Sequence, residues 1–481
     1  MINTQPVLFC FRNDLRVSDN PALTAAVETG QPVIACFILD NTSSNPWLPG
    51  GASRWWLHHS LQNLEISLAK LGGQLILQRG PWDQSVLNLA KQADVSTVFF
   101  SRAYEPFGAT QEVNLKSQLD SLNIETKRYG GYLFFEPEQI KTLNDEPYKV
   151  FTPFWKRCLE RLNPKLPHNR PQSLDFAKVS LPSDKLENWK LLPTKSDWAV
   201  GLKQTWRPGE EGAWSRLTEF FDGAVQDYKE KRDVPSVIGT SRLSPHLHFG
   251  EITPRQIWHY AQAALSSAPQ LQKGTDAFIR ELGWRDFSYH LLHHWPHLPE
   301  SPFRKQFAEF PWQKDSESLR KWQKGQTGIP LVDAGMRELW HTGWMHNRVR
   351  MIVASLLVKN LLIPWQEGEA WFWDTLVDAD LGNNAAGWQW VAGSGADAAP
   401  YFRIFNPVTQ SQKFDSDGVY IKQWVPELQK LPAKHIHAPW LAPESVLKQA
   451  SLTLGQNYPL PIVDLKASRQ RALDAYQAIK T

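Results

Sequence analysis

Two stretches of the chain, GWMHNRVRM (343–351) and DADLGNNAAGWQW (378–390), carry the pattern on which the fold and the candidate site depend. Four side chains of the first stretch recur at helical spacing: Trp344, Asn347, Arg350 and Met351. Residues three, four and seven positions apart share one side of a helix. Because a buried amide or guanidinium requires polar partners, a helix face of this composition predicts a ligand site.

The composition of the 481-residue chain limits the classes of protein to which it can belong. Its length is enough for two or three domains. A net charge of +3 is too small to indicate nucleic-acid binding by itself. The 23 tryptophans are the unusual feature. Packing alone does not require so many large side chains, so we expect some of them to serve a site.

Cysteine usage and hydropathy exclude further classes. The three cysteines, Cys10, Cys36 and Cys158, lack metal-ligand spacing, so we expect no zinc site and no four-cysteine iron–sulfur cluster. The N-terminus lacks the basic and apolar regions of a signal peptide, and no apolar run approaches the length of a membrane span. These features predict a soluble, cytoplasmic protein without a membrane partner.

The first 130 residues alternate continuous apolar runs with amphipathic stretches, which indicates a parallel sheet covered on both faces. The predicted strands are 7–11, 32–39, 74–78 and 96–101, and the predicted helices are 53–71, 82–93 and 109–121. FRNDLRVSDN follows the first strand where a Rossmann fold has G-x-G-x-x-G. We therefore do not expect this sheet to bind a dinucleotide in the Rossmann manner.

The rest of the chain has a different pattern. Residues 163–205 contain five prolines in a polar sequence of weak periodicity, which is typical of a connector. From Trp206 onward the pattern is helical. We predict a Rossmann-like α/β domain without the glycine fingerprint (1–130), an inter-domain linker (131–205) and a large all-α domain (206–481).

The segment GTSRLSPHLHFGEI (239–252) surrounds Arg242 with hydroxyl side chains just before a predicted helix. Hydroxyl and backbone N–H groups at a helix start bind anions, most often phosphate, although an ordinary serine cap has the same pattern. Arg242 and Arg350 together can neutralise a diphosphate. Asp378 and Asp380 can accept hydrogen bonds from ribose or flavin groups, but paired carboxylates also suit hydrolysis or Mg²⁺ binding.

Seven motifs occur together in a characteristic order: FRNDLRVSDNPAL (11–23), KVFTPF (149–154), TSRLS (240–244), ELGWRDF (281–287), TGWMHNRVRM (342–351), DADLGNNAAGWQW (378–390) and YFRIFNP (401–407). Over nearly the whole chain the sequence resembles the photolyase/cryptochrome family. The resemblance implies an α/β antenna-binding domain followed by a helical domain that binds FAD and DNA.

The resemblance also implies which residues hold the flavin. The implied FAD contacts are Tyr228, Thr240, Ser241, Arg242, Leu243, Ser244, Phe278, Arg285, Trp344, Asn347, Arg350, Asp378, Asp380 and Asn384. The family stabilises its flavin as an anionic hydroquinone. An amide at Asn384 suits that state, because it adapts to a protonated flavin nitrogen without adding negative charge.

Members that repair cyclobutane pyrimidine dimers bind the flipped-out lesion through a glutamate and flanking side chains. Here the implied lesion and DNA contacts are Glu281, Trp284, Asn347, Met351, Trp390, Arg232, Arg348, Arg403 and Gln410. Enzymes for (6-4) photoproducts place histidines where Asn347 and Met351 stand. The resemblance therefore implies a lyase that splits cyclobutane dimers in UV-damaged DNA by electron transfer from excited reduced FAD.

Three tryptophans match the family's electron-transfer chain: Trp388, Trp365 and Trp312. Indoles suit this task because they are oxidisable and can pass charge over short gaps. With Glu281 and Asn384, these tryptophans are the implied catalytic residues. Trp388 follows Asn384 by four residues, one helical turn, so it is expected to lie beside the flavin.

The segments SPHLHFGEI (244–252) and FRKQFAEFPW (303–312) are more similar to class III dimer photolyases and plant cryptochromes than to class I enzymes, and class I is the next choice. Class III members imply an antenna of 5,10-methenyltetrahydrofolate. Ligands of open α/β sheets bind at the carboxyl ends of the strands. The antenna residues expected there are Asp40, Asn41, Arg54, Trp55, Glu105 and His248.

Two other functions are compatible with parts of the sequence. A cryptochrome-type photoreceptor would bind flavin and signal without repair. No long tail follows residue 470, so we expect no signalling appendage of the plant type. A nucleotide-binding α/β enzyme that uses Asp378 and Asp380 for Mg²⁺ would leave the tryptophan excess unexplained. We expect a monomer that repairs DNA.

Overall fold

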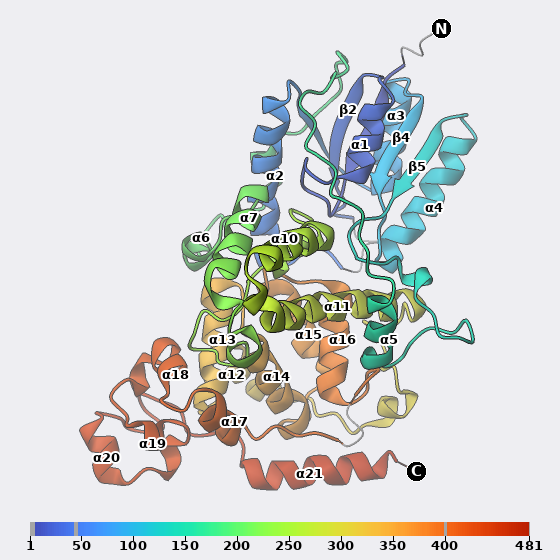
Figure 1. Ribbon diagram of the computed structural model, residues 1–481. Helices are drawn as coiled ribbons and strands as arrows, with labels where there is room; N and C mark the ends of the chain where they lie inside the picture. The colour runs from blue at the N-terminus through green and yellow to red at the C-terminus, as the bar shows by residue number, and fades with distance from the viewer. Residues whose placement is uncertain (1–4, 43–46, 399–401, 481) are drawn as a thin grey trace. The chain divides into compact units, whose positions relative to one another are not determined.

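The computed structural model describes residues 5–42, 47–398 and 402–480; Tyr401 of the YFRIFNP motif lies outside them. The chain forms two compact units, which are described separately (Figure 1). Unit 1 comprises Met1–Asp197, Trp206–Gly223 and Ser241–Pro296, and unit 2 comprises Trp198–Thr205, Ala224–Thr240 and His297–Thr481. The predicted division at residues 130 and 205 remains a prediction.

Unit 1 is built on a five-stranded parallel sheet of order β3-β2-β1-β4-β5. The strands are β1 (Val7–Phe11), β2 (Val33–Leu39), β3 (Leu75–Arg79), β4 (Thr97–Ser101) and β5 (Glu125–Tyr129). Four of them confirm the strands predicted from apolar runs. β5 was missed because it is an edge strand with the polar sequence ETKRY, which lacks the apolar run of a doubly covered strand.

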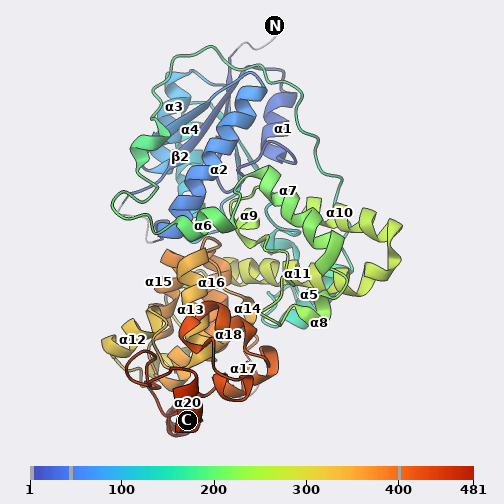
Figure 2. The same cartoon turned by 90° about the vertical axis from the view of Figure 1, so that its left-hand side faces the viewer.

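Helices cover the sheet on both faces (Figure 2). They are α1 (Pro21–Glu28), α2 (Gly51–Lys70), α3 (Trp82–Gln92) and α4 (Pro106–Asp120). α3 and α4 contact each other and pack on one face, over buried side chains such as Leu8 and Val98. The predicted helices correspond to α2, α3 and α4, whereas α1 was not predicted.

Part of the predicted linker packs against this sheet. The backbone N–H of Val33 donates to the carbonyl of Asp175 (2.7 Å), and that of Ala177 donates to the carbonyl of Val33 (3.0 Å). Gly73 allows the close approach, because a Cβ there would lie 2.0 Å from the ring of Phe176. This part of the connector is therefore held by the α/β layer.

Further helices complete unit 1: α5 (Phe151–Leu159), α7 (Glu210–Glu219), α9 (Ser244–His248), α10 (Pro254–Ser267) and α11 (Gln272–His294). In α11 a Cβ at Gly283 would lie 2.4 Å from the Trp155 ring. That glycine is required for α11 to pack on α5, because a methyl group has no room there.

Unit 2 is helical in its described part. Its helices are α6 (Val200–Thr205), α8 (Tyr228–Lys231), α12 (Ser316–Gln323), α13 (Pro330–Thr342), α14 (Asn347–Ser355), α15 (Trp365–Thr375), α16 (Leu381–Ala392), α17 (Pro407–Phe414), α18 (Val419–Trp424), α19 (Ala433–Ile436), α20 (Glu444–Gln449) and α21 (Leu465–Ala478), with a π-helical turn, η6 (Leu356–Asn360), after α14. One large apolar cluster joins α12 to α16 and α18. None of the helices in the described part of the chain combines the length and apolar character that a bilayer crossing requires.

Candidate active site

The turn between α13 and α14 places the GWMHNRVRM segment in unit 2. α13 ends at Thr342 and is capped by Gly343, whose φ of 67° lies in the left-handed region, and α14 begins at Asn347. Trp344 therefore precedes the helix, and the prediction that it shares a helix face with Asn347 is wrong. The reason is the glycine C-cap, which stops one helix and leaves three residues before the next.

α14 is held at its N-terminus by a buried polar network. The side chain of His346 accepts a hydrogen bond from the backbone N–H of Arg348 (3.2 Å). The carboxylate of Glu338 accepts from the His346 backbone (3.3 Å) and from the Tyr420 hydroxyl (2.6 Å). A cap of this kind satisfies backbone donors that a helix start leaves unpaired, and it fixes where the following arginines lie.

Arg350 forms the principal ion pair of this region. Its Nη2 lies 2.9 Å from Oδ2 of Asp378, and its Nε donates to the carbonyl of Met345 (2.8 Å). The Asp378 side chain is only 5% exposed, so breaking this pair by removing one partner would be strongly destabilising. Arg350 and Asp378, both predicted FAD contacts, thus form an ion pair with each other within the protein.

α16 begins at Leu381 and is capped by Asp380, whose side chain accepts from the backbone N–H of Asn383 (2.8 Å). One turn later, the amide nitrogen of Asn384 donates to the carbonyl of Glu369 on α15 (3.1 Å). No donor among the described residues reaches Oδ1 of Asn384, so that oxygen can accept from an N–H group of a ligand. The DADLGNNAAGWQW segment therefore presents an oriented amide, and its contact with a flavin stays a prediction.

Glu369 is a buried carboxyl with almost no polar environment. Its side chain is 1% exposed, and its Oε1 has no hydrogen-bond partner among the described residues. Burial raises the pKa of Glu369 to about 9, because a carboxylate is poorly solvated there. The group is therefore neutral at pH 7. Sequence analysis missed it, since nothing in EGEAWFW indicates which glutamate is enclosed.

Trp388 packs closely against α15. A Cβ at Gly368 would lie 2.1 Å from the Trp388 ring, so the glycine makes room for the indole. The ring neighbours of Trp388 are Phe372, with centroids 5.0 Å apart, and Trp322, at 6.2 Å. Trp388 and Asn384 lie on the same helix, which confirms their predicted one-turn relation.

The other two tryptophans of the predicted chain belong to the same apolar region. Trp365, at the start of α15, is 1% exposed, whereas Trp312 is half-buried and packs at the edge of the cluster. Transfer of an electron along Trp388, Trp365 and Trp312 remains a prediction. Trp322, which is fully buried beside Trp388, was not part of the predicted set.

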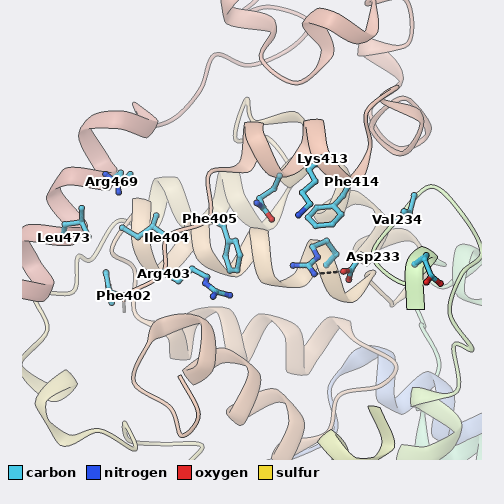
Figure 3. A pocket seen from close by; sticks show the side chains of 13 residues that line it. Asp233, Val234, Phe402, Arg403, Ile404, Phe405, Lys413, Phe414, Arg469 and Leu473 are labelled. Atoms are coloured by element: carbon cyan, nitrogen blue, oxygen red, sulfur yellow. Dashed lines mark hydrogen bonds and ion pairs between the residues drawn. The ribbon is translucent and has the colours of Figure 1, made fainter. Parts of the chain in front are cut away.

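A deep groove opens on unit 2 (Figure 3). Its volume is about 740 Å³, and four cationic side chains line it: Arg348, Arg403, Lys413 and Arg469. Gln410 lines it as well, so the groove brings together three predicted DNA contacts, Arg348, Arg403 and Gln410. We call it the basic groove. Arg232, the fourth predicted contact of this kind, is not among its lining residues; its guanidinium lies over the ring of Tyr228.

Two of the groove cations were missed by sequence analysis. Lys413 lies on α17 and Arg469 on α21, and both are exposed. Figure 3 shows them around the groove together with Arg403. The segment before α21 has no motif that links it to residues 348 or 403, so only the folded chain shows that Arg469 belongs here.

Trp390 lies near this groove, in the last turn of α16. A smaller hollow is lined by Trp390, Arg403 and Phe402 among others, with the Arg403 guanidinium 6.0 Å from the Trp390 ring. Lys359 donates to the last carbonyl of α16, that of Ala392 (2.6 Å), and burial lowers the pKa of this amine. Lys359 thus fixes the end of the helix that carries Trp390.

The ELGWRDF residues lie in unit 1, on α11. Trp284 stacks on Phe151, with ring centroids 3.6 Å apart and planes inclined by 12°. Glu281, one turn earlier, is half-buried. Spacing of three residues places both on one side of α11.

The predicted FAD contacts are divided between the two units. Unit 1 contains six of them: Ser241, Arg242, Leu243, Ser244, Phe278 and Arg285. Unit 2 contains the other eight: Tyr228, Thr240, Trp344, Asn347, Arg350, Asp378, Asp380 and Asn384. Phe278 packs on Phe220 (4.7 Å between centroids), and Arg285 donates to the carbonyl of Tyr132 (2.7 Å). The Arg285 guanidinium thus has a protein partner.

The Ser-Thr segment before α9 has a special backbone. Arg242 adopts a φ of 51°, in the left-handed region, which is uncommon for a residue with a side chain. The backbone N–H of Leu243 donates weakly to the hydroxyl of Ser241 (3.4 Å), and α9 begins at Ser244. Strain of this type often accompanies ligand loops, which agrees with the anion site that the sequence indicates.

The carboxyl ends of the strands of unit 1 enclose a cavity of about 90 Å³. Its lining includes Arg12, Tyr104, Glu105, Tyr132 and Tyr289. Glu105 is the predicted antenna residue that it contains. Tyr104 precedes Glu105 at the same strand end, whereas Tyr132 and Tyr289 were missed because they lie far from it in the sequence and share no motif.

The other predicted antenna residues lie elsewhere in unit 1. The Asp40 carboxylate accepts from the Trp82 backbone (3.2 Å) and the Gln111 amide (2.5 Å). Trp55 is 1% exposed, whereas Asn41 and Arg54 are exposed. The His248 ring packs on Phe249. Of the six, Glu105 is the one among the lining residues of the cavity described above, and the antenna site stays a prediction.

The arrangement defines a class of protein: an α/β unit with a polar cavity at its strand ends, and a helical unit with an oriented amide, enclosed indoles and a basic groove. Comparison with known proteins agrees with this class. Residues 278–478 match the FAD binding domain of DNA photolyase, and residues 7–172 match the DNA photolyase domain.

Individual relatives extend over the whole chain. A deoxyribodipyrimidine photo-lyase of Agrobacterium fabrum is 49% identical over 100% of this chain and 99% of its own. The crystal structure of a class III photolyase from Agrobacterium tumefaciens superposes with a TM-score of 0.94 at 49% identity, covering 99% of this chain and 98% of that one. A cryptochrome from Synechocystis sp. PCC6803 gives 0.90 at 33% identity, covering 99% and 100%. The chain belongs to the photolyase/cryptochrome family.

We expect Arg403→Ala and Arg469→Ala each to weaken binding to any DNA duplex and to reduce the slope of log K against log salt by about one, as the loss of one phosphate contact should. Fluorescence anisotropy at several salt concentrations measures this. Lys434→Ala, an exposed cation outside the groove lining, is the matched control. If the salt slopes of the two arginine variants equal that of the control, Arg403 and Arg469 do not contact DNA phosphates.

We expect Glu369→Gln to change the pH dependence of stability. Wild-type Glu369 holds its proton up to about pH 9 in the folded protein, against an ordinary value of 4.5. As pH rises between these values, only the unfolded chain loses the proton, so the wild type loses up to about 1.4 kcal/mol per pH unit relative to the variant. Urea unfolding of both proteins should show a difference that grows with pH and then levels off. Parallel pH profiles would contradict a protonated Glu369.

Proposed function

We propose that this protein is a light-dependent DNA repair enzyme that splits cyclobutane pyrimidine dimers, with FAD as its catalytic cofactor. The basic groove is the observation that supports this most directly. It brings Arg348, Arg403, Lys413 and Arg469 together on unit 2, although the net charge of the chain is only +3. A local cluster of cations binds a polyanion where the overall charge would not.

The residues of unit 2 fit a flavin. Asn384 retains a carbonyl oxygen that can accept from a flavin N–H, and the neutral Glu369 adds no negative charge beside it. Asp378 and Asp380 offer acceptors, and Arg350 compensates the charge of Asp378. When bound in its reduced form, FAD supplies the electron that blue light drives into the dimer. Neither the protonated Glu369 nor the paired Asp378 therefore opposes an anionic flavin.

The lesion residues divide into two kinds of contact. Trp284 and Trp390 offer indole faces on which a flipped-out dimer can stack. Glu281 offers a carboxyl group that can hydrogen-bond the carbonyl groups of the bases. Asn347 is exposed and Met351 half-buried at the start of α14, where they would complete the lesion contacts. The absence of histidine at both positions favours the cyclobutane dimer over the (6-4) photoproduct.

We further propose that the enzyme is of class III, that it acts as a monomer and that its antenna is 5,10-methenyltetrahydrofolate. The relative of known structure with 49% identity is a class III photolyase. The cavity of unit 1, with Glu105 in its lining, lies at the carboxyl ends of the strands, where open α/β sheets bind ligands. The absorption spectrum of the purified protein distinguishes a folate from a deazaflavin or from no antenna.

The alternative is a photoreceptor that binds flavin without repair. Cryptochromes share the fold, as the Synechocystis structure shows. The retained glutamate and tryptophans at positions 281, 284 and 390 favour repair. A repair assay on oligonucleotides with a defined cyclobutane dimer, in blue light and in darkness, separates the two functions. Failure to restore the dimer in light, with FAD bound and reduced, would favour the photoreceptor.

We expect Glu281→Ala to lower the yield of repair about tenfold while changing DNA affinity little, since a hydrogen bond to a group that becomes charged contributes about 1.5 kcal/mol. Single-turnover repair by fully reduced enzyme measures the yield. Asp276→Asn, which alters an exposed carboxylate on the same helix, should repair normally. Wild-type yield from the Glu281 variant would show that this carboxyl has another role.

We expect Trp388→Phe to block light-driven reduction of oxidised flavin but to spare repair by protein reduced beforehand. Phenylalanine fills most of the same space beside Gly368, yet it is far harder to oxidise than an indole. Transient absorption should then lack a long-lived tryptophan radical. Trp424→Phe alters a half-buried indole of the same unit and serves as control. A normal radical signal in the Trp388 variant would move the electron entry to another indole.

A further inference from the structure

One of the groove cations is already paired with a carboxylate. Nη2 of Arg348 lies 2.8 Å from Oδ2 of Asp233, and the two side chains are 20% and 33% exposed. Both line the basic groove, and Figure 3 draws their ion pair as the dashed line at Asp233. The pair therefore occupies the surface on which a DNA phosphate would lie.

The local structure holds both partners of this pair in place. The guanidinium of Arg348 lies over the ring of Phe414, 4.5 Å from its centroid. Asp233 follows α8 in a turn that closes with a hydrogen bond from Val234 N–H to the carbonyl of Lys231 (3.0 Å). The contact is thus between two restrained groups, unlike a surface ion pair of two long flexible side chains.

A carboxylate and a phosphate compete for the same donors. Both present anionic oxygens that match the fork of a guanidinium. Asp233 also places a negative charge, with Glu230, on the lining of a groove that must accept a polyanion. A phosphate that approaches Arg348 must therefore displace Asp233 or bind beside it against like-charge repulsion.

We propose that Asp233 is a built-in competitor for the DNA phosphate at Arg348, and that it keeps the affinity for undamaged DNA low. This inference rests on the proposed function, because it takes DNA as the ligand. Binding to undamaged duplex depends almost wholly on phosphate contacts, whereas a flipped lesion adds contacts of its own. Undamaged sites are in large excess, so a repair enzyme must dissociate from them quickly. A carboxylate that competes for Arg348 shortens the time for which the enzyme stays bound to such sites.

The test is the affinity of Asp233→Asn for an undamaged duplex and for the same duplex with one cyclobutane dimer. We expect the variant to bind both about three- to tenfold more tightly at low salt, with a salt slope steeper by up to about one. The dissociation rate from undamaged DNA should fall. Binding that is unchanged or weaker would overturn the proposal, and weaker binding would show instead that Asp233 positions Arg348 for the phosphate.

Two controls separate competition from a general charge effect. Asp227→Asn makes the same change of charge six residues earlier, at an exposed carboxylate that pairs with Lys231 and is not among the groove lining. It should alter affinity less than twofold, since an exposed charge outside the groove is largely screened. In an Arg348→Ala background, Asp233→Asn should lose most of its effect. An equal gain from Asp227→Asn, or a full gain without Arg348, would also overturn the proposal.

Light-driven dimer repair, measured on the same preparations, keeps the two hypotheses apart. If the wild type repairs dimers and Asp233→Asn binds undamaged DNA no more tightly, only the competitor role fails. If the wild type neither binds DNA nor repairs dimers, the proposed function fails and the competitor role fails with it. Flavin content and the unfolding midpoint of each variant exclude misfolding as the cause of a loss.

Discussion

The contact between α15 and α16 is the constraint on which the candidate active site depends. Gly368 has no side chain, so the Trp388 ring lies where a Cβ would otherwise be, 2.1 Å away. At the same seam the Asn384 amide donates to the Glu369 carbonyl. These two contacts bring an oxidisable indole, an oriented amide and a protonated carboxyl into one packed region. A larger residue at position 368 would separate them.

The electrostatics of unit 2 follow from burial and pairing more than from the number of charges. Glu369 is neutral because it is enclosed, and Asp378 is charged and matched by Arg350. The lining of the basic groove contains four cations and two carboxylates, those of Glu230 and Asp233. Affinity for a polyanion there is the difference between attraction and competition, which explains why a net charge of +3 says little about DNA binding.

A strand or helix could be predicted where its own sequence has the hydrophobic pattern of that element. Four buried strands follow from continuous apolar runs, whereas β5 escaped because an edge strand needs no such run. The one-turn relation between Asn384 and Trp388 was predictable, because their spacing of four residues is that of a helix, whereas the cap at Asp380 became evident only in the structure. The predicted helix face shared by Trp344 and Asn347 was wrong. The helical spacing of these residues does not reveal that Gly343 caps one helix before the next begins.

The sequence by itself determined the family, the α/β and helical composition, and most candidate residues, because these are expressed in local motifs and their order. Only the tertiary structure decided that Arg469 lines the groove, that Asp233 pairs with Arg348, and that Glu369 rather than a neighbouring acid is enclosed. The physical reason is that pairing and desolvation depend on residues far apart in the chain. Arg348 and Asp233 are 115 positions apart, and no local pattern connects them.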